Sequence, residues 1–512
     1  MPSSSQPILK PKQVFRDASR AYRRKRRRGY LRMLADCAGY VCGFPRDAER
    51  AGVAPTPFAP HALDPLFFGM NVCPSPDPAG DAIQIEALRD LGARAVRIDY
   101  GAKADRGPAD RFLERLLGAG FPVTLHLVQD PYEACAMADD PSQRRRWRDF
   151  VDAALGRYGQ RGAGERGVAN MAQPPSAVRE GASERGKSDE SDAGRRERLD
   201  GTGRVEAIEV GSTPNRHSWS GYTLADYAAA SRVAREALDA WSASHRDLEP
   251  PLLLGPNISD FAPYFTIGQL AECRRAGVRF DVMTDNLFVD RVGEPEAHDP
   301  HVLGKALRGL HRLDLARKQQ SLAAIGRRFG AARSWCAYMH YTLCFGRPRR
   351  RHVTPEQYAN YMVRAHILTA AAGCFERLYW GTLVDHYKGL IDETARVRPY
   401  PPFVHHRFAV DGPPSEWKRR DDFFRAYSTL TRHLAGRRFV RRYATEPDVF
   451  VFEFADEEGS VFAGWTRDGR ERSLDAASVS SGKGVSERID RGGNALEPGD
   501  AIPLAAAPVW WR

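Results

Sequence analysis

Polar and aromatic side chains follow a series of short apolar runs in the sequence, where the ends of strands are expected. Such a mixture suits a sugar, because a pyranose ring offers hydroxyl groups for hydrogen bonds and an apolar face for aromatic packing. In chain order these residues are Asn71, Arg97, Asp99, Gln129, Asp130, Thr213, Asn215, Asn257, Asp285, Asn286, Tyr338, His340, Trp380 and Asp385. Their types therefore predict a saccharide ligand.

The elements that must position these residues are eight apolar runs that alternate with helical stretches. Segments such as 82–92, 224–241 and 355–373 have apolar residues three and four positions apart, which is typical of helices. The eight predicted strands span residues 66–72, 93–100, 121–129, 205–212, 251–258, 280–289, 334–343 and 375–383. Eight successive βα units with nearly continuous apolar strands favour an α/β fold of the (β/α)₈ TIM barrel type over an open doubly wound sheet. The C-terminal ends of the strands would then meet at one mouth of the barrel.

Further segments complete the predicted organisation. Residues 1–60 form a basic N-terminal arm or helix, and residues 61–436 form the barrel. Within the barrel, residues 159–204 are rich in charge, Gly, Ser and Pro, so we expect a disordered insertion that acts only as a spacer. A last helix at 416–436 precedes alternating short strands at 448–456, 460–469 and 507–512, which predict a small C-terminal antiparallel β domain over 437–512.

The net charge of +11 is concentrated near the N-terminus. Residues 16–32 contain nine Arg or Lys and one Asp, a net +8 that leaves +3 for the other residues. This block is a candidate for docking on an anionic membrane surface, at about 1 kcal/mol for each basic residue near the lipid. The alternative is a solvated arm without a dedicated partner. Nucleic acid is the least expected partner, because no nucleic-acid-binding module follows the block.

The N-terminal sequence lacks the apolar core of a secretory signal, so the expected location is the cytoplasm, with the inner membrane surface as a peripheral site. Eight scattered cysteines have no zinc or redox spacing and are expected to be free thiols, mostly buried. His217 and His340 have no carboxylate or second histidine at ligand spacing. No metal and no cofactor are therefore expected.

Several motifs occur in an order that resembles a known family. They are FFGMNV (67–72), VRIDY (96–100), IEVGSTPN (208–215), LYWGTLVDHYKGLID (378–392), FAGWTRDG (462–469) and PVWW (508–511). Together they resemble the clan of retaining (β/α)₈ glycoside hydrolases, especially the β-xylosidases and α-iduronidases, whose members carry a C-terminal β domain. The resemblance covers about residues 64–512 apart from the insertion. It implies that Arg97 is the active-site arginine and that Trp380 lies under the sugar.

The two catalytic glutamates of that clan are missing at the positions that the resemblance assigns. One glutamate protonates the leaving oxygen and the other attacks the anomeric carbon. Thr213 stands where a motif of the type EIGNEPN has its acid, and Tyr338 stands at the nucleophile; no Asp or Glu occurs in 210–225 or 315–355. Threonine cannot act as a general acid. Tyrosine has an ordinary pKa near 10 and needs a neighbouring base, for which strand order suggests Asp285.

The other carboxylates near the strand ends are assigned structural roles. Glu209 lies four residues before Thr213 on the same strand face, so we expect it inside the barrel, paired with Arg97. Asp99, Asp130 and Asp385 are expected to cap helices or anchor loops. Glu294 and Glu296 are expected to be solvated or paired with Arg291.

Two hypotheses follow for the function. In the first, a glycoside hydrolase-like barrel acts on or binds a saccharide, with Asp285 and Tyr338 as a rearranged catalytic pair or with catalysis lost. In the alternative, the chain is a non-catalytic carbohydrate-binding or scaffold protein in the assembly of a bacterial surface polysaccharide at the cytoplasmic face of the membrane. Under both hypotheses the predicted saccharide-binding residues are Arg97, Thr213, Asn215, Trp219, His340 and Trp380.

Overall fold

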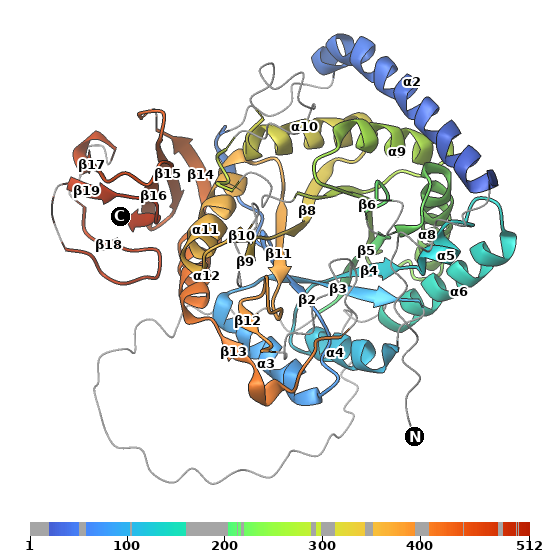
Figure 1. Cartoon of the computed structure of the whole chain (residues 1–512), viewed down its shortest axis with the longest axis horizontal. Coiled ribbons are helices and arrows are strands. Elements are labelled where there is room, and N and C mark those ends of the chain that lie inside the picture. The colour runs from blue at the N-terminus through green and yellow to red at the C-terminus, as the bar shows by residue number, and fades with distance from the viewer. Residues whose placement is uncertain are drawn as a thin grey trace, which may run out of the picture.

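The computed structural model is built around a closed barrel of eight parallel strands (Figure 1). The strands are β2 (Phe68–Val72), β3 (Ala95–Gly101), β4 (Val123–Val128), β5 (Val205–Val210), β6 (Leu252–Ser259), β7 (Val282–Asn286), β8 (Arg333–Met339) and β11 (Arg377–Thr382). They pair in this order, and β11 closes the ring against β2. The predicted TIM barrel is therefore confirmed, and each predicted strand overlaps one of these eight.

The structure describes residues 20–50, 58–102, 105–159, 203–211, 213–216, 220–287, 293–297, 313–343, 352–394, 409–443, 445–479, 485–497, 499 and 501–512. Within 20–50, side chains are described for residues 22–40. Nearly all of the predicted insertion at 159–204 lies outside these ranges, as do residues 1–19 and 51–57 of the predicted N-terminal segment.

Helices cover the outside of the barrel. They are α3 (Pro78–Leu91), α4 (Arg106–Gly118), α5 (Pro131–Ala134), α6 (Pro141–Tyr158), α8 (Leu224–Ser244), α9 (Pro263–Arg275), α10 (Leu315–Arg328), α11 (Pro355–Ala372) and α12 (Asp421–Leu434). Their starts follow local chemistry: Thr223 and Thr354 form capping boxes with Asp226 and Gln357. The predicted helix at 416–436 begins only at α12, because η3 (Pro414–Glu416) precedes it and β13 (Lys418–Arg419) pairs with β12 (Ile391–Asp392).

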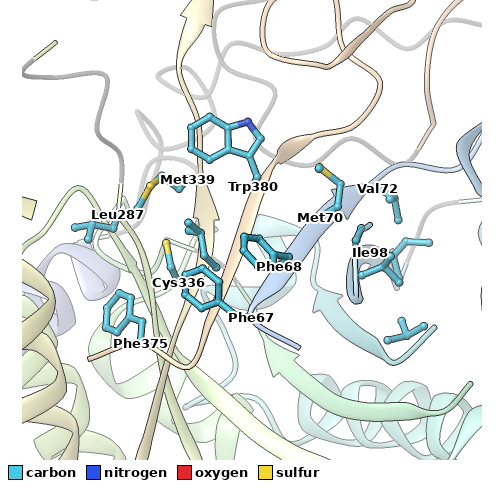
Figure 2. Close-up of a cluster of buried hydrophobic side chains, with 14 of the residues drawn as sticks. Phe67, Phe68, Met70, Val72, Ile98, Leu287, Cys336, Met339, Phe375 and Trp380 are labelled. Carbon is cyan, nitrogen blue, oxygen red and sulfur yellow. The ribbon is translucent and has the colours of Figure 1, made fainter. Parts of the chain in front are cut away.

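The barrel strands divide their side chains between the interior and the helical layer. The interior holds a buried cluster made up of Ala95, Ala207, Leu254, Val282, Trp335 and Tyr379. The outward side chains pack with the helices in a larger core, and Figure 2 shows Phe68 and Met70 of β2 near Met339 and Trp380 in this core. Which of the two faces a residue occupies decides whether it can reach the barrel mouth.

The C-terminal part forms antiparallel sheets beside α11 and α12 (Figure 1). The larger sheet has the order β1 (His61–Ala62), β14 (Arg438–Arg442), β15 (Val449–Asp456), β16 (Gly459–Thr466), β20 (Val509–Trp511) and β18 (Arg488–Ile489). The smaller sheet pairs β17 (Arg472–Asp475), which η4 (Ala476–Ser478) follows, with β19 (Ala501–Leu504). The predicted strands at 448–456, 460–469 and 507–512 are confirmed. A short parallel pair, β9 (Thr342–Leu343) and β10 (His352–Val353), precedes α11.

A buried ion pair joins the barrel to the C-terminal sheet. Arg364 of α11 donates from Nε to Oε1 of Glu296 at 2.8 Å and bonds the second carboxylate oxygen through Nη2. Trp465 of β16 donates its indole N–H to the same Oε1 at 2.8 Å. Both charged side chains are only 1% exposed. The prediction that Glu296 is solvated or paired with Arg291 is therefore wrong, because its loop folds beneath α11, which the sequence does not show.

Helix α2 (Arg20–Arg50) lies across the outside of the barrel, next to α9 (Figure 1). Lys25 places its Nζ 2.7 Å from the carboxylates of Asp139 and Asp226, and the Asp226 side chain is fully buried. Met33 packs against Gly268 of α9, where any added Cβ would collide with the Met33 side chain. Part of the basic N-terminal block thus fastens α2 to the barrel.

Candidate functional site

Arg97 of β3 lies at the centre of a hydrogen-bonded cluster inside the barrel. Its Nε and Nη2 lie 2.7 and 2.6 Å from Oε2 of Glu209, and its Nη1 donates to Oδ1 of Asn71 at 3.0 Å. Asp99 lies two positions after Arg97 on β3, and its Oδ1 is 3.4 Å from Nη1 of Arg97. The predicted pairing of Glu209 with Arg97 is confirmed. Glu209 is fully buried, whereas the Asp99 side chain is 18% exposed, so Asp99 is the carboxylate of this cluster that a ligand can reach.

The ionisation of the cluster follows from burial and neighbouring charge. Burial by itself lowers the pKa of a guanidinium, but the carboxylates of Glu209 and Asp99 raise the pKa of Arg97 above its ordinary value. Burial and the charge of Arg97 lower the pKa of His126, whose Nδ1 lies 2.7 Å from Asp99. The neutral imidazole must then carry its proton on Nδ1 to bond the carboxylate. The cluster thus combines a fixed cation with an oriented carboxylate.

A β-bulge in β8 directs Tyr338 toward the barrel mouth. Cys336 pairs with Leu378 and Met339 pairs with Trp380, so β8 has one residue more than β11 over this stretch. Cys336 and Met339 both pack in the outer core, and the extra residue turns Tyr338 inward. Its hydroxyl lies 3.0 Å from Oγ1 of Thr382.

Tyr338 and His340 form an uncharged pair at the end of β8. Their rings meet edge to face with centroids 5.0 Å apart. Burial raises the pKa of Tyr338 above its ordinary value, and the carboxylates of Asp385 and Asp99 act in the same direction. Burial lowers the pKa of His340 well below its ordinary value. A tyrosine that keeps its proton is a hydrogen-bond donor, which is the opposite of an activated nucleophile.

Thr213 and Asn257 have strained backbones at the ends of β5 and β6. Their φ angles are 52° and 51°, in the left-handed region that a β-branched residue such as threonine rarely adopts. The Thr213 N–H donates to the carbonyl of Asn257 at 3.0 Å. Within the described residues, the Thr213 hydroxyl and both polar atoms of the Asn257 amide are buried without a hydrogen-bond partner. Strain and unpaired polar groups of this kind concentrate at ligand sites.

Asn215 holds the loop after β5 against the end of β6. Its amide nitrogen donates to the carbonyl of Ser259 at 2.8 Å, and its Oδ1 accepts from the Ser259 N–H at 3.1 Å. These bonds indicate a positioning residue. Trp219, the other predicted binding residue of this loop, lies outside the described residues.

Trp380 lies in the core between the barrel and α11, and the structure corrects the prediction that it packs under a sugar. Its side chain is 0% exposed, and its indole N–H donates to the hydroxyl of Tyr358 at 3.0 Å. Figure 2 shows the ring among the side chains of the buried core. The physical reason is strand alternation: Tyr379 points into the barrel, so its neighbour Trp380 points outward.

Asp285 also faces the helical layer and is therefore separated from Tyr338. The prediction that Asp285 acts as the base for Tyr338 is wrong. Val282 of β7 fills the interior, and Met283 contacts Gly326 of α10. By alternation Asp285 shares the face of Met283. Its charged neighbour is Lys318 of α10, and within the described residues neither carboxylate oxygen has a hydrogen-bond partner. Burial raises the pKa of Asp285 well above its ordinary value, although Lys318 lowers it in part.

Asp285→Asn should therefore stabilise the protein at alkaline pH. A carboxyl group whose pKa rises on folding contributes stability below its unfolded pKa near 4, and this contribution is lost as the pH rises through the folded pKa. We expect the free energy of unfolding to change little at pH 4 and to increase by roughly 2 kcal/mol at pH 8, measured by urea denaturation. The exposed Asp149→Asn should have no effect at either pH. A loss of stability at pH 8 would instead mean that Asp285 is a charged partner of Lys318.

Other residues of the site were predicted with mixed success. Asp130 caps α5 and Asp385 accepts from the backbone N–H groups of Tyr387 and Lys388, so both expected structural roles are confirmed. His126 is a residue of the site that the sequence analysis does not identify. The Thr124 hydroxyl lies 2.8 Å from the Tyr379 hydroxyl inside the barrel. His126 lies two positions after Thr124 and therefore also points inward, so strand alternation is the signal that identifies it.

Solved structures are similar to this chain in fold. A family 51 α-L-arabinofuranosidase from Bifidobacterium longum has a TM-score of 0.50 at 11% identity, with 89% of this chain and 96% of that chain covered. A conserved exported protein from Bacteroides fragilis has a TM-score of 0.53 at 10% identity, with 89% and 98% covered. A glucosidase from Croceicoccus marinus has a TM-score of 0.47 at 14% identity, with 90% and 97% covered. No protein-family model and no curated protein matches the sequence. The likeness at these identities shows the fold alone.

Proposed function

We propose that the barrel mouth binds a saccharide and does not hydrolyse it by the two-carboxylate mechanism. The observation that carries this proposal is the pair Thr213 and Tyr338, which stand at the strand ends where the resemblance to retaining glycoside hydrolases assigns glutamates. Thr213 is buried and its hydroxyl has no hydrogen-bond partner among the residues that the structure describes, and burial raises the pKa of Tyr338. Both are groups that hydrogen-bond to hydroxyls, and neither supplies the acid or the nucleophile that glycosidic cleavage needs.

The remaining carboxylates near the mouth are held by other groups. Glu209 is fully buried and bonded to Arg97. Asp99 bonds His126 and Arg97, and Asp385 accepts from two backbone N–H groups. A retaining hydrolase needs one free carboxylate and one protonated carboxylic acid about 5 Å apart. Each of the three carboxylates here instead accepts hydrogen bonds from a cation or from N–H groups of the chain.

The same groups suit recognition of a sugar. Asp99 can accept from a sugar hydroxyl while Arg97 holds its orientation, and the Tyr338 and His340 rings offer an apolar edge beside polar atoms. Thr213 supplies a further hydroxyl at the end of β5. We assign the binding role to Arg97, Asp99, Thr213, Tyr338 and His340, with Asn215 as a positioning residue.

Calorimetric titration with β-xylosyl, β-glucosyl and α-arabinofuranosyl oligosaccharides tests the proposal, together with turnover of the matching aryl glycosides. We expect binding of at least one sugar and no release of the aryl group above the uncatalysed rate. Asp99→Asn should weaken binding by about 10-fold or more, because a hydrogen bond to a charged group is lost, whereas the exposed Asp149→Asn should not. Turnover that disappears in Asp99→Asn, or binding of no sugar in the set, would overturn the proposal.

A narrower candidate is a scaffold role in the assembly of a bacterial surface polysaccharide at the membrane. The exposed arginines of α2 favour this role, because they supply a cationic surface on the outside of the barrel. Retention of a fluorescent oligosaccharide on anionic vesicles should then require the protein. Asp99→Asn should release the sugar while the protein stays on the vesicles, and simultaneous loss of both would contradict the candidate.

A further inference from the structure

Helix α2 has an inner face that is fully engaged with the barrel. Its members lie three or four positions apart and contact α8, α9, α10 or the loop after β5. They are Tyr22, Lys25, Gly29, Met33, Cys37 and Tyr40. Tyr22 donates its hydroxyl to the carbonyl of Gly221 at 3.2 Å, and Arg328 of α10 packs over the Tyr40 ring. The orientation of α2 is therefore fixed, which also fixes what it presents on its other side.

Among residues 22–40, where side chains of α2 are described, the opposite face of the helix carries only basic and apolar side chains. With 100° between successive residues, seven exposed positions fall within an arc of about 120°. They are Arg24, Arg27, Arg28, Leu31, Leu34, Ala35 and Ala38. We call these seven residues the outer arc. Leu31 and Leu34 are 65% and 62% exposed, and the three arginines make no ion pair with any residue that the structure describes.

Exposed large hydrophobic side chains gather at this helix. Within the described residues there are five: Tyr30, Leu31, Leu34, Tyr132 and Tyr264. Three belong to α2, and the carbonyl of Tyr264 in α9 accepts from the Cys37 thiol of α2 at 3.2 Å. Single exposed apolar residues need no explanation, but Leu31 and Leu34 lie three positions apart among the arginines of the outer arc, which calls for one.

We propose that the outer arc docks on an anionic lipid bilayer, with the arginines at the headgroups and Leu31 and Leu34 in the boundary of the acyl chains. Basic residues beside exposed leucines on one face are the composition of helices that lie in a membrane interface. A nucleic acid would engage the arginines but has no use for the two leucines. Among the described residues, no helix has the length and apolar character needed to cross a membrane.

Docking on lipid does not depend on saccharide binding. It also involves only some of the basic residues of the N-terminal block. Lys25 belongs to that block, yet it points inward to Asp226 and Asp139 and takes no part in docking. Docking instead depends on three arginines and two leucines in one arc. It would hold the barrel at the membrane by the side on which α9 lies (Figure 1).

Co-sedimentation of the full chain with vesicles tests this inference. We compare phosphatidylcholine vesicles with vesicles that contain about one third phosphatidylserine, at low and high salt. Arg24→Gln, Arg27→Gln and Arg28→Gln together should weaken binding to the anionic vesicles on the order of 100-fold at low salt. Leu31→Ser with Leu34→Ser should weaken it about 10-fold or more at both salt concentrations. The melting temperature should stay unchanged, because the outer arc lies away from the contacts of α2.

A matched control removes the same charge from other surfaces. Arg89→Gln, Arg145→Gln and Arg246→Gln change three exposed arginines outside α2, and we expect binding within about twofold of the unmodified chain. Equal weakening in this control would mean that net charge alone drives binding. Tighter binding to a DNA duplex than to vesicles, with the leucine variant unaffected, would point to nucleic acid. Either result, or no binding to anionic vesicles by the unmodified chain, would overturn the inference.

Discussion

Arg364→Met is expected to lower the free energy of unfolding by about 4 kcal/mol. Methionine fills much of the space of the arginine stem but leaves Glu296 buried without its cation. Because the Glu296 side chain is 1% exposed, water cannot replace the lost partner. Chemical denaturation at neutral pH measures the change. We expect the fluorescence of Trp465 to report it as well, since its indole N–H bonds the same carboxylate.

Two further variants identify the cause of this loss. Adding Glu296→Gln to Arg364→Met should recover part of the stability, because the buried charge is then removed. Arg425→Met breaks the exposed pair with Asp422, at 2.6 Å, and should leave the stability almost unchanged because solvent screens the pair. A loss below about 1 kcal/mol in Arg364→Met would mean that the buried pair contributes little to stability.

Arg97→Met should remove saccharide binding and also lower the free energy of unfolding by about 3 kcal/mol. In this variant Glu209 stays fully buried without a cation and Asp99 loses its hydrogen bond from Arg97. The deficit in stability is expected because a buried charge without a partner is costly. Chemical denaturation and calorimetric titration measure the two effects.

The double variant Arg97→Met with Glu209→Gln separates the binding role of Arg97 from its structural role. Removing the buried carboxylate should restore most of the stability, while binding should stay lost because Asp99 is no longer oriented. Recovery of binding together with stability would show that Arg97 acts only by holding the barrel together. That result would exclude it from the binding site.

The barrel was predictable because its strands are buried on both faces and therefore stand out as apolar runs. The same burial hides which face a residue occupies. Trp380 and Asp285 lie in apolar runs with no alternation of polarity, so the sequence does not show that both point to the helices. Tyr338 reaches the mouth through a bulge, and one extra residue reverses the faces of all that follow.

Charged residues within buried strands were more predictable than their apolar neighbours. The charges of Arg97 and Glu209 have to compensate each other, because neither charge can be buried in the interior without an opposite charge beside it. Partners far apart in sequence were not predictable. Glu296 lies 68 positions from Arg364, and Lys25 lies 201 positions from Asp226. Their pairing depends on how a loop or a helix lies over the barrel, and no local pattern encodes that placement.

Closure of the ring also sets the order of events during synthesis. Phe68 of β2 pairs with Leu378 of β11, 310 positions later in the chain. At about 5–20 residues per second, a ribosome needs roughly 15–60 s to synthesise β11 after it has synthesised β2. Throughout this interval the edge of β2 that later pairs with β11 has unpaired backbone groups, and its Phe68 and Met70 side chains lack part of their packing. The nascent chain therefore passes through a long stage in which an unpaired strand is open to chaperones and to aggregation.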